Sequence, residues 1–233
     1  MEQLNGRGQA MDVGEAVAGR RSVRGFLPDA VDPAVIRRVL DQAARSPSGG
    51  NLQPWRIDVV SGDALARLKA IMLARVQEAP QGEPAEYDIY PKELDPRHKA
   101  YRFEVGEDLY GALGIPRENK LGRLLWFARN FQFFGAPLAL FTSVDRTMGP
   151  PQWSDLGMFL QTVMLLLRGE GLDSCAQECW AVYPQTVGTF LALPPERMLF
   201  CGMAIGVADP GDPANAVRAR RAAVADFATF HDA

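Results

Sequence analysis

The chain contains 233 residues, of which 47% are hydrophobic and 23% are charged. This length and composition allow a substantial buried core and predict one globular domain over residues 1–233. The formal net charge of −3 argues against a protein that coats nucleic acid, because binding along a phosphate backbone requires a strong positive field. We therefore expect no nucleic-acid partner, and any anion-binding site must be a local cluster.

The number of cysteines and the lengths of the apolar segments indicate the cellular compartment in which the protein is found. The three cysteines, Cys175, Cys179 and Cys201, are too few and odd in number for a disulfide framework, and no histidine lies near them to complete a zinc site. They predict reduced thiols and no bound metal. Residues 1–17 lack the apolar core of a signal peptide, and the most apolar stretch, 156–167, is shorter than the roughly 20 residues of a membrane span. We expect a cytoplasmic protein without a membrane partner.

The first third of the chain predicts helices, a small-residue loop and one short strand. Asp32 and Pro33 are an N-cap and a first-turn proline, which mark the start of a helix. In chain order, the patterns predict helices over 11–20 and 33–44, a loop over 46–51, a strand over 56–60 and a helix over 63–77.

An irregular excursion follows over 78–96, where the apolar periodicity fails and prolines are frequent. Long loops in compact domains often act as lids over a site. Beyond it, the patterns predict helices over 104–113 and 117–134, a buried strand over 137–144, an apolar helix over 153–169, an irregular segment to 182, a helix over 184–192, a strand over 199–207 and a polar tail. Few short strands separated by long helices leave the α/β and α+β classes open.

A compact basic cluster, RRSVR at residues 20–24, follows the first predicted helix. Arginine offers a planar fork of donors that matches phosphate oxygens, and Ser22 adds a hydroxyl donor. Basic residues at a helix C-terminus also interact favourably with the helix dipole, without any ligand. The cluster therefore predicts an anion site only in combination with other signals.

The loop SPSGGNLQPW at residues 46–55 is the more specific signal. Its small residues let a planar ligand approach the backbone closely, and Asn51 and Gln53 offer both donors and acceptors. A plain connection between a helix and a strand rarely combines these features. The loop predicts part of a cofactor pocket.

In order along the chain, five segments and three tail residues resemble the nitroreductase family of flavin enzymes. They are RRSVRGF at 20–26, SPSGGNLQPW at 46–55, NFQFFGAP at 130–137, SCAQEC at 174–179, CGMAIG at 201–206, and Asn215, Arg218 and Arg221. The resemblance implies an α+β fold with a small, mostly antiparallel sheet flanked by helices, a long buried central helix and a C-terminal extension that wraps the partner of a homodimer. It also implies flavin mononucleotide (FMN) as cofactor and NADH or NADPH as co-substrate.

The resemblance also assigns roles to individual residues. Arg20, Arg21, Ser22 and Arg24 would hold the phosphate and ribityl end of FMN, with Arg221 closing over the phosphate. Pro47, Ser48, Gly49, Asn51 and Gln53 would come from the other subunit, and Glu178 and Cys179 would pass along the flavin ring. No dedicated acid, base or nucleophile is implied, because the flavin performs the chemistry.

The sequence departs from the family pattern at two places. Ala176 and Cys179 stand where proline and glycine usually flank the ring-side glutamate, and Ala219 stands where several relatives carry a lysine. Arg218 or Arg220 would have to assist Arg221 at the phosphate. The sequence does not distinguish between these two arginines.

The implied activity is reduction of nitroaromatic or quinone acceptors by alternating, ping-pong transfer of hydride. Related flavin reactions form an alternative: enone reduction, reductive dehalogenation or flavin cleavage, with specificity carried by the excursion at about 78–120. A flavin-binding module without turnover is a further alternative. The sequence leaves the acceptor, the choice between NADH and NADPH, and the role of the excursion open.

Overall fold

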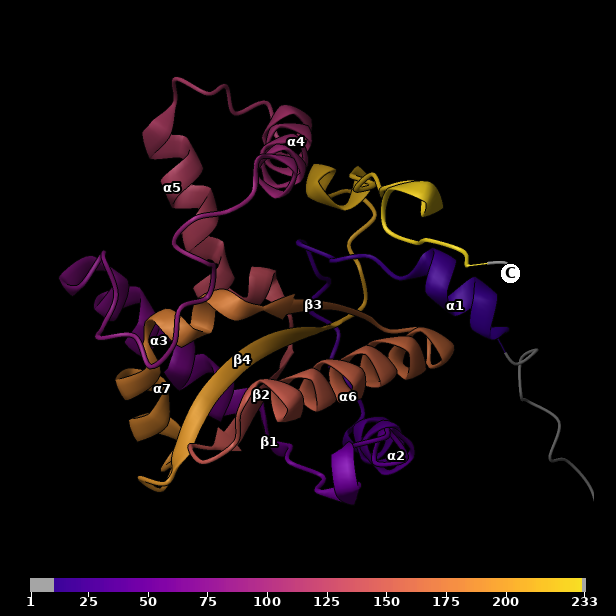
Figure 1. Ribbon diagram of the computed structural model, residues 1–233. Coiled ribbons are helices and arrows are strands. Elements are labelled where there is room, and N and C mark those ends of the chain that lie inside the picture. The colour runs from indigo at the N-terminus through magenta and orange to yellow at the C-terminus, as the bar shows by residue number, and fades with distance from the viewer. Residues whose placement is uncertain (1–10, 232–233) are drawn as a thin grey trace, which may run out of the picture.

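A four-stranded sheet lies at the centre of the computed structural model, which describes residues 11–231. Its strands are β1 (Arg56–Ser61), β2 (Leu138–Asp145), β3 (Asp173–Gln177) and β4 (Arg197–Gly206). They lie in the order β1-β2-β4-β3, and each neighbouring pair is antiparallel (Figure 1). The expected α+β class with a small antiparallel sheet is confirmed.

The burial of strand β2 on both faces explains why its sequence is almost continuously apolar. Its successive side chains point to opposite faces of the sheet, so Leu138 and Leu140 pack into one hydrophobic core. Ala139 and Phe141 pack into a second core on the other face. Because both faces of the sheet are covered, this strand has no solvent-facing side and no polar alternation.

Helices cover both faces of the sheet. On one face lie α2 (Pro33–Ala43) and α6 (Pro150–Gly169), whose apolar residues join the core formed with Leu138 and Leu140. On the other face lie α3 (Gly62–Glu78), the 3-10 helix η2 (Arg129–Gly135) and α7 (Pro184–Leu191) (Figure 1). The short helix α1 (Val13–Gly19) lies against α6.

The central helix α6 buries one side completely and leaves the other side partly open. Leu156, Phe159, Val163 and Leu167 follow helical spacing and are buried. On the opposite side Met158 retains 39% of its exposure. A single copy of the chain therefore leaves apolar surface on its longest helix.

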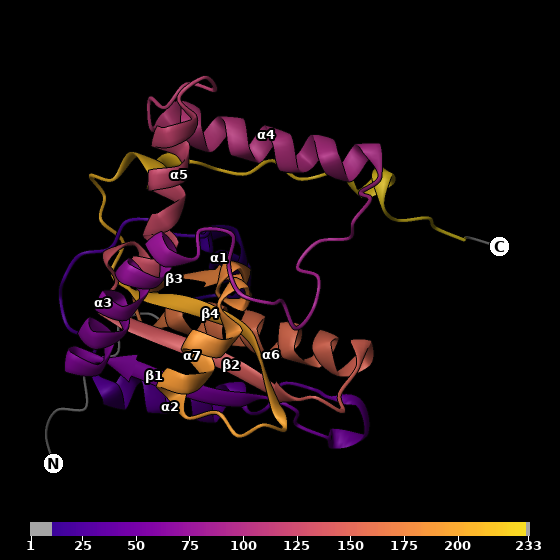
Figure 2. The ribbon, with the colours of Figure 1, turned by 90° about the vertical axis from the view of Figure 1, so that its left-hand side faces the viewer.

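Two helices project from the sheet on the side of β3. They are α4 (Pro96–Ala112) and α5 (Lys120–Ala128), and α5 leads into η2 (Figures 1 and 2). The tail after β4 contains the short 3-10 helices η4 (Pro213–Ala216) and η5 (Val224–Asp226) and runs beside α4 in both views.

Three predicted elements differ from the observed ones. The helix expected over 104–113 begins at Pro96, because Asp95 caps it and Pro96 occupies its first turn. The helix expected over 117–134 ends at Ala128, because the chain tightens into η2. The segment expected to be irregular up to 182 contains strand β3 and the 3-10 helix η3 (Glu178–Val182).

None of the helices within residues 11–231 combines the length and the hydropathy that a membrane crossing requires.

Gly202 in β4 makes room for the buried side chain of Trp180. A Cβ atom on Gly202 would lie 2.4 Å from Cδ1 of Trp180. Trp180 is completely buried and stacks on Phe133, with their ring centroids 4.5 Å apart. A methyl group at residue 202 would therefore collide with the buried indole.

We predict that Gly202→Ala lowers the free energy of unfolding by about 1–3 kcal/mol, because the added methyl group overpacks this core. Gly111→Ala is the matched control, since nothing lies within 4 Å of a Cβ at that exposed helical position. It should gain up to about 1 kcal/mol from helix propensity. Urea unfolding monitored by tryptophan fluorescence measures both changes, and equal midpoints for the two variants would contradict the packing argument.

Candidate functional site

The basic cluster at residues 20–24 is fixed to the edge of the sheet. Helix α1 ends at Gly19, and the chain continues extended from Arg20. Ser22 forms a parallel bridge with Ser174 of β3, and the Val23 amide donates to the Ser174 carbonyl at 3.0 Å. The Val23 side chain is completely buried. The arginines on either side of Val23 are therefore held on a rigid strand edge.

Asn215 of the tail ties this segment to the C-terminal part of the chain. Its Oδ1 accepts from the Arg24 amide at 2.7 Å, and its Nδ2 donates to the carbonyls of Gly25 and Asp209 at 2.8 and 2.9 Å. The tail approaches so closely that a Cβ atom on Gly25 would lie 2.3 Å from Asp212. Only glycine at residue 25 leaves room for this contact.

The Asn215 contact brings two arginines together. Burial and the charge of Arg218 lower the pKa of the Arg21 guanidinium, and the charge of Asp173 only partly offsets them. Its Nε is buried without a hydrogen-bond partner. The neighbouring Arg168 is neutralised by Asp173 at 2.6 Å. A buried donor without a protein partner, next to a second guanidinium group, is an arrangement that can hold an anion.

The structure separates the roles of the tail arginines. Arg218 lies close enough to Arg21 to lower its pKa. Arg220 turns away to α4, where its guanidinium lies 3.3 Å from Asp108 and 3.9 Å from Glu104. Arg221 donates only to backbone carbonyls of Ala219 and Arg220. Of the two arginines left open by the sequence, Arg218 is the one at the cluster.

The turn after β3 is fixed from both sides. Gln177 donates to the Asn130 carbonyl at 2.8 Å and accepts from the Trp180 indole at 3.3 Å. Glu178 follows at an exposed position, where surrounding protein still desolvates its carboxyl and raises its pKa. Burial likewise raises the pKa of the Cys179 thiol, so this thiol stays protonated at neutral pH.

The loop at 46–55 is held against the beginning of α6. The Gly49 amide donates to the buried Asp155 carboxylate at 3.2 Å, and Ser48 accepts from the Gln53 amide at 3.0 Å. Asn51 and Gln53 both have a left-handed backbone, with φ values of 57° and 48°. Non-glycine residues in this region carry strain that is concentrated at functional sites.

Sequence reasoning missed two side chains that hold these segments in place. The surrounding apolar residues of the helix drew attention away from Asp155. A carboxylate in such a helix nevertheless indicates a nearby hydrogen-bond donor, because a buried charge needs a partner. Asn215 was recognised only as a landmark, and its anchoring role depends on contacts distant in sequence.

The predicted site residues form two groups at opposite ends of α6. Arg21 lies beside Arg168 near the end of the helix, whereas the loop contacts Asp155 near its beginning. At 1.5 Å per residue these two positions are about 20 Å apart. One copy of the chain therefore does not bring the cluster and the loop to the same point.

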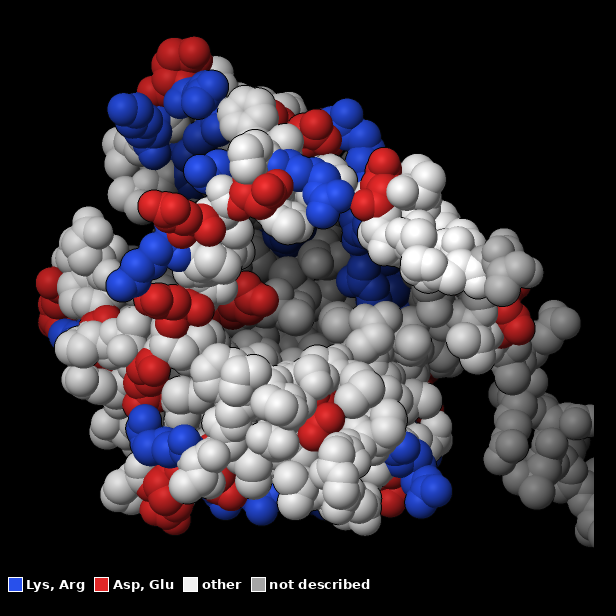
Figure 3. All heavy atoms as spheres, in the orientation of Figure 1, with Lys and Arg blue, Asp and Glu red and all other residues white. Residues whose placement is uncertain are grey.

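The aromatic residues near the site divide into core and surface. Trp126, Phe131, Phe133 and Phe134 are buried, whereas Phe127 retains 44% of its exposure on α5. A hollow opens between the projecting α4–α5 unit and the body of the protein, and positively charged side chains line part of its wall (Figure 3).

The family assignment follows from the family model. The model of the nitroreductase family matches residues 17–207, which include the basic cluster, the loop and all four strands. The chain belongs to the nitroreductase family.

Relatives of known activity and structure match over nearly the whole chain. Nitrobenzene nitroreductase of Ectopseudomonas oleovorans is 34% identical over 222 residues, covering 94% of this chain and 96% of that protein. The FMN- and NADPH-dependent nitroreductase NfnB of Sphigopyxis sp. strain HMH is 45% identical, covers 95% of this chain and 100% of that chain, and superposes with a TM-score of 0.92. NfnB of Mycobacterium smegmatis in complex with NADPH is 29% identical with a TM-score of 0.88, over 95% of this chain and 100% of that one.

We predict that Asn215→Ala lowers the free energy of unfolding by about 1–3 kcal/mol, because it leaves the Arg24 amide without a partner and removes one of the two hydrogen bonds that each carbonyl of Gly25 and Asp209 accepts. Gln42→Ala on the exposed side of α2 is the control and should change stability by less than about 0.5 kcal/mol. Urea unfolding measures both, and an Asn215→Ala midpoint equal to that of the control would refute the anchoring role.

Proposed function

We propose that this chain is an FMN-dependent oxidoreductase that uses NADH or NADPH to reduce nitroaromatic or quinone acceptors. The observation that carries the proposal is the pair of Arg21 and Arg218, held together although they repel each other, with a buried Arg21 Nε that has no partner. A phosphate monoester dianion supplies the missing acceptor and offsets both charges. The relatives reported above, which include a nitrobenzene nitroreductase and an FMN- and NADPH-dependent nitroreductase, support the same chemistry.

The cluster holds the phosphate and ribityl end of FMN in this proposal. Arg20, Arg21, Ser22 and Arg24 supply donors from the edge of the sheet, Arg218 supplies a second guanidinium, and Arg221 closes over the phosphate from the tail. Strand β3 ends at Gln177, about 10 Å from Ser174 at 3.3 Å per residue, and Glu178 and Cys179 follow directly in η3. An elongated cofactor lying along this strand would have its ring beside them.

The second wall of the site comes from another copy of the chain. Pro47, Ser48, Gly49, Asn51 and Gln53 lie at the far end of α6 from the cluster, and the partly exposed side of that helix offers apolar surface for pairing, including Met158. A two-fold homodimer repeats the same contacts in both directions, which places the loop of each copy at the cluster of the other. The tail would wrap the partner in this arrangement.

FMN supplies the redox chemistry when bound, accepting hydride equivalents and passing them to the acceptor. The residues of the chain bind, orient and exclude water. Burial raises the pKa of the thiols of Cys175, Cys179 and Cys201, so none of them offers a thiolate nucleophile at neutral pH. This fits a site where backbone amides and cations, rather than an acid–base pair, support the reaction.

The proposal includes a single domain over residues 1–233 and a lid over about 78–120 that covers the site. A cytoplasmic location is also part of it, since the three cysteines are free and a reducing compartment keeps them so.

We predict that Arg21→Ala weakens FMN binding about ten- to hundred-fold, because it removes a charge-assisted contact to phosphate. Arg38→Ala is the control, since Arg38 pairs with Glu170 on the exposed surface and should leave FMN affinity unchanged. Flavin fluorescence titration of the apoprotein measures both. Equal affinity in the two variants, or a protein that binds no FMN at all, would contradict the proposal.

We predict parallel lines when initial rates are measured against NADPH at several fixed concentrations of a nitroaromatic acceptor. The co-substrate and acceptor share one face of the cofactor in our proposal, so the first product leaves before the acceptor binds. Intersecting lines would show that both are bound together and would contradict the alternation.

A further inference from the structure

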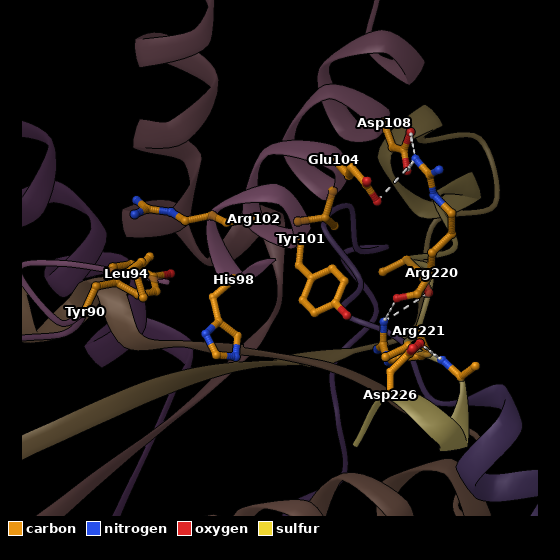
Figure 4. Close-up of a pocket in the computed structure, with 14 residues that line it drawn as sticks. Tyr90, Leu94, His98, Tyr101, Arg102, Glu104, Asp108, Arg220, Arg221 and Asp226 are labelled. Atoms are coloured by element: carbon orange, nitrogen blue, oxygen red, sulfur yellow. Dashed lines mark hydrogen bonds and ion pairs between the residues drawn. The ribbon is translucent and has the colours of Figure 1, made fainter. Parts of the chain in front are cut away.

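A cavity separate from the basic cluster lies between α4 and the tail. Its volume is about 850 Å³. One side of α4 contributes His98, Tyr101 and Val105, the preceding segment contributes Tyr90, and residues 219–223 of the tail close the opposite side. His98 and Tyr101 point from α4 into this space, and Arg221 faces them from the tail (Figure 4).

The tail is fastened across the cavity at two points. Arg220 pairs with Asp108 at one point, and Arg97 donates to the Asp226 carbonyl at 3.0 Å at the other. Arg221 lies three residues beyond Arg218, so the cavity begins within about 11 Å of the basic cluster along the tail. A ligand long enough to span both places could contact the cofactor at one end and the cavity at the other.

Three arginines and three carboxylates line the cavity: Arg102, Arg220 and Arg221, and Glu104, Asp108 and Asp226. The carboxylates are already engaged, because Glu104 and Asp108 pair with Arg220, and Asp226 accepts from the Ala223 amide. Among the described residues, Lys92, Lys99 and Arg102 make no ion pair with a carboxylate, whereas Arg220 is neutralised by α4 and Arg221 is assigned to the FMN phosphate in the proposed function. Arg102 packs over the Tyr90 ring, with its guanidinium carbon 4.2 Å from the ring centroid. It borders both this cavity and a neighbouring hollow that contains Lys92 and Lys99.

These side chains define the chemistry of the ligand. Tyr90, His98 and Tyr101 offer flat surfaces on which a planar base can stack. The unpaired cations select a base that carries phosphate. A neutral nitroaromatic would fill the aromatic part and leave the cations without partners, whereas a dinucleotide phosphate satisfies both.

We propose that this cavity binds the 2′-phosphoadenosine end of NADPH, with the Arg102 guanidinium beside the 2′-phosphate. The inference rests on the proposed function and extends it, because it assigns NADPH rather than NADH as the preferred co-substrate. Arg102 is a specificity residue, since it contacts the one group that distinguishes the two nucleotides and lies away from the reacting atoms.

The test compares Arg102→Ala with Arg117→Ala in the FMN-loaded protein. Arg117 also packs over an aromatic ring, Phe103, at 5.2 Å, but it does not line the cavity. The wild type should show a lower KM for NADPH than for NADH. Arg102→Ala should raise the KM for NADPH about ten-fold and the KM for NADH less than two-fold, with kcat unchanged. Arg102→Lys should recover part of the loss, and Arg117→Ala should match the wild type with both nucleotides.

Other outcomes would overturn the assignment. Equal changes in both KM values, accompanied by a lower melting temperature, would mean that Arg102 only fastens Tyr90 to α4. Unchanged values for both nucleotides would place the 2′-phosphate elsewhere. In both cases the FMN-bound protein still oxidises NADH with a nitroaromatic, and the proposed function survives. If neither nucleotide bleaches the bound flavin, the proposed function itself fails.

Discussion

The Asn215 amide holds together two segments that lie 190 residues apart, and the proposed anion site depends on it. Its three hydrogen bonds fix the segment after α1 against the tail, which places Arg218 beside Arg21. Two guanidinium groups do not approach each other without a reason, because their repulsion opposes folding. Backbone and amide hydrogen bonds therefore impose the arrangement, and in our proposal the phosphate of FMN makes it favourable. The specificity of the site comes from this geometry and not from net charge, since the whole chain is slightly acidic.

The long helix α6 sets the second constraint. It positions the basic cluster at one end and the small-residue loop at the other, so in our proposal one copy contains two half-sites rather than one site. Asn51 and Gln53 have a left-handed backbone. In our proposal this strained conformation shapes the loop for the FMN that the cluster of the other copy holds. The same proposal accounts for the exposed apolar side of α6, because pairing of two copies would bury it.

Sequence patterns predicted much of the fold and part of the site, and the failures have physical causes. The loop at 46–55 was predictable because glycine, serine and proline dictate its local conformation. Strand β3 was not predictable in this way, because residues 173–177 become a strand only by pairing with β4 and with Ser22, which are distant in sequence. The early start of α4 was signalled by Asp95 and Pro96 but was obscured by the prolines before it. The choice between Arg218 and Arg220 required knowing where Glu104 and Asp108 lie.

The most direct test of the central claim is complementation between two defective copies. One copy carries Arg21→Ala and Arg218→Ala, the other carries Asn51→Ala and Gln53→Ala, and two affinity tags isolate the mixed dimer. Because each mixed dimer contains one intact cluster facing one intact loop, it should bind about one FMN with near wild-type affinity, while either mutant homodimer binds FMN weakly. A mixed dimer that binds FMN no better than the two homodimers would contradict a site built from two copies.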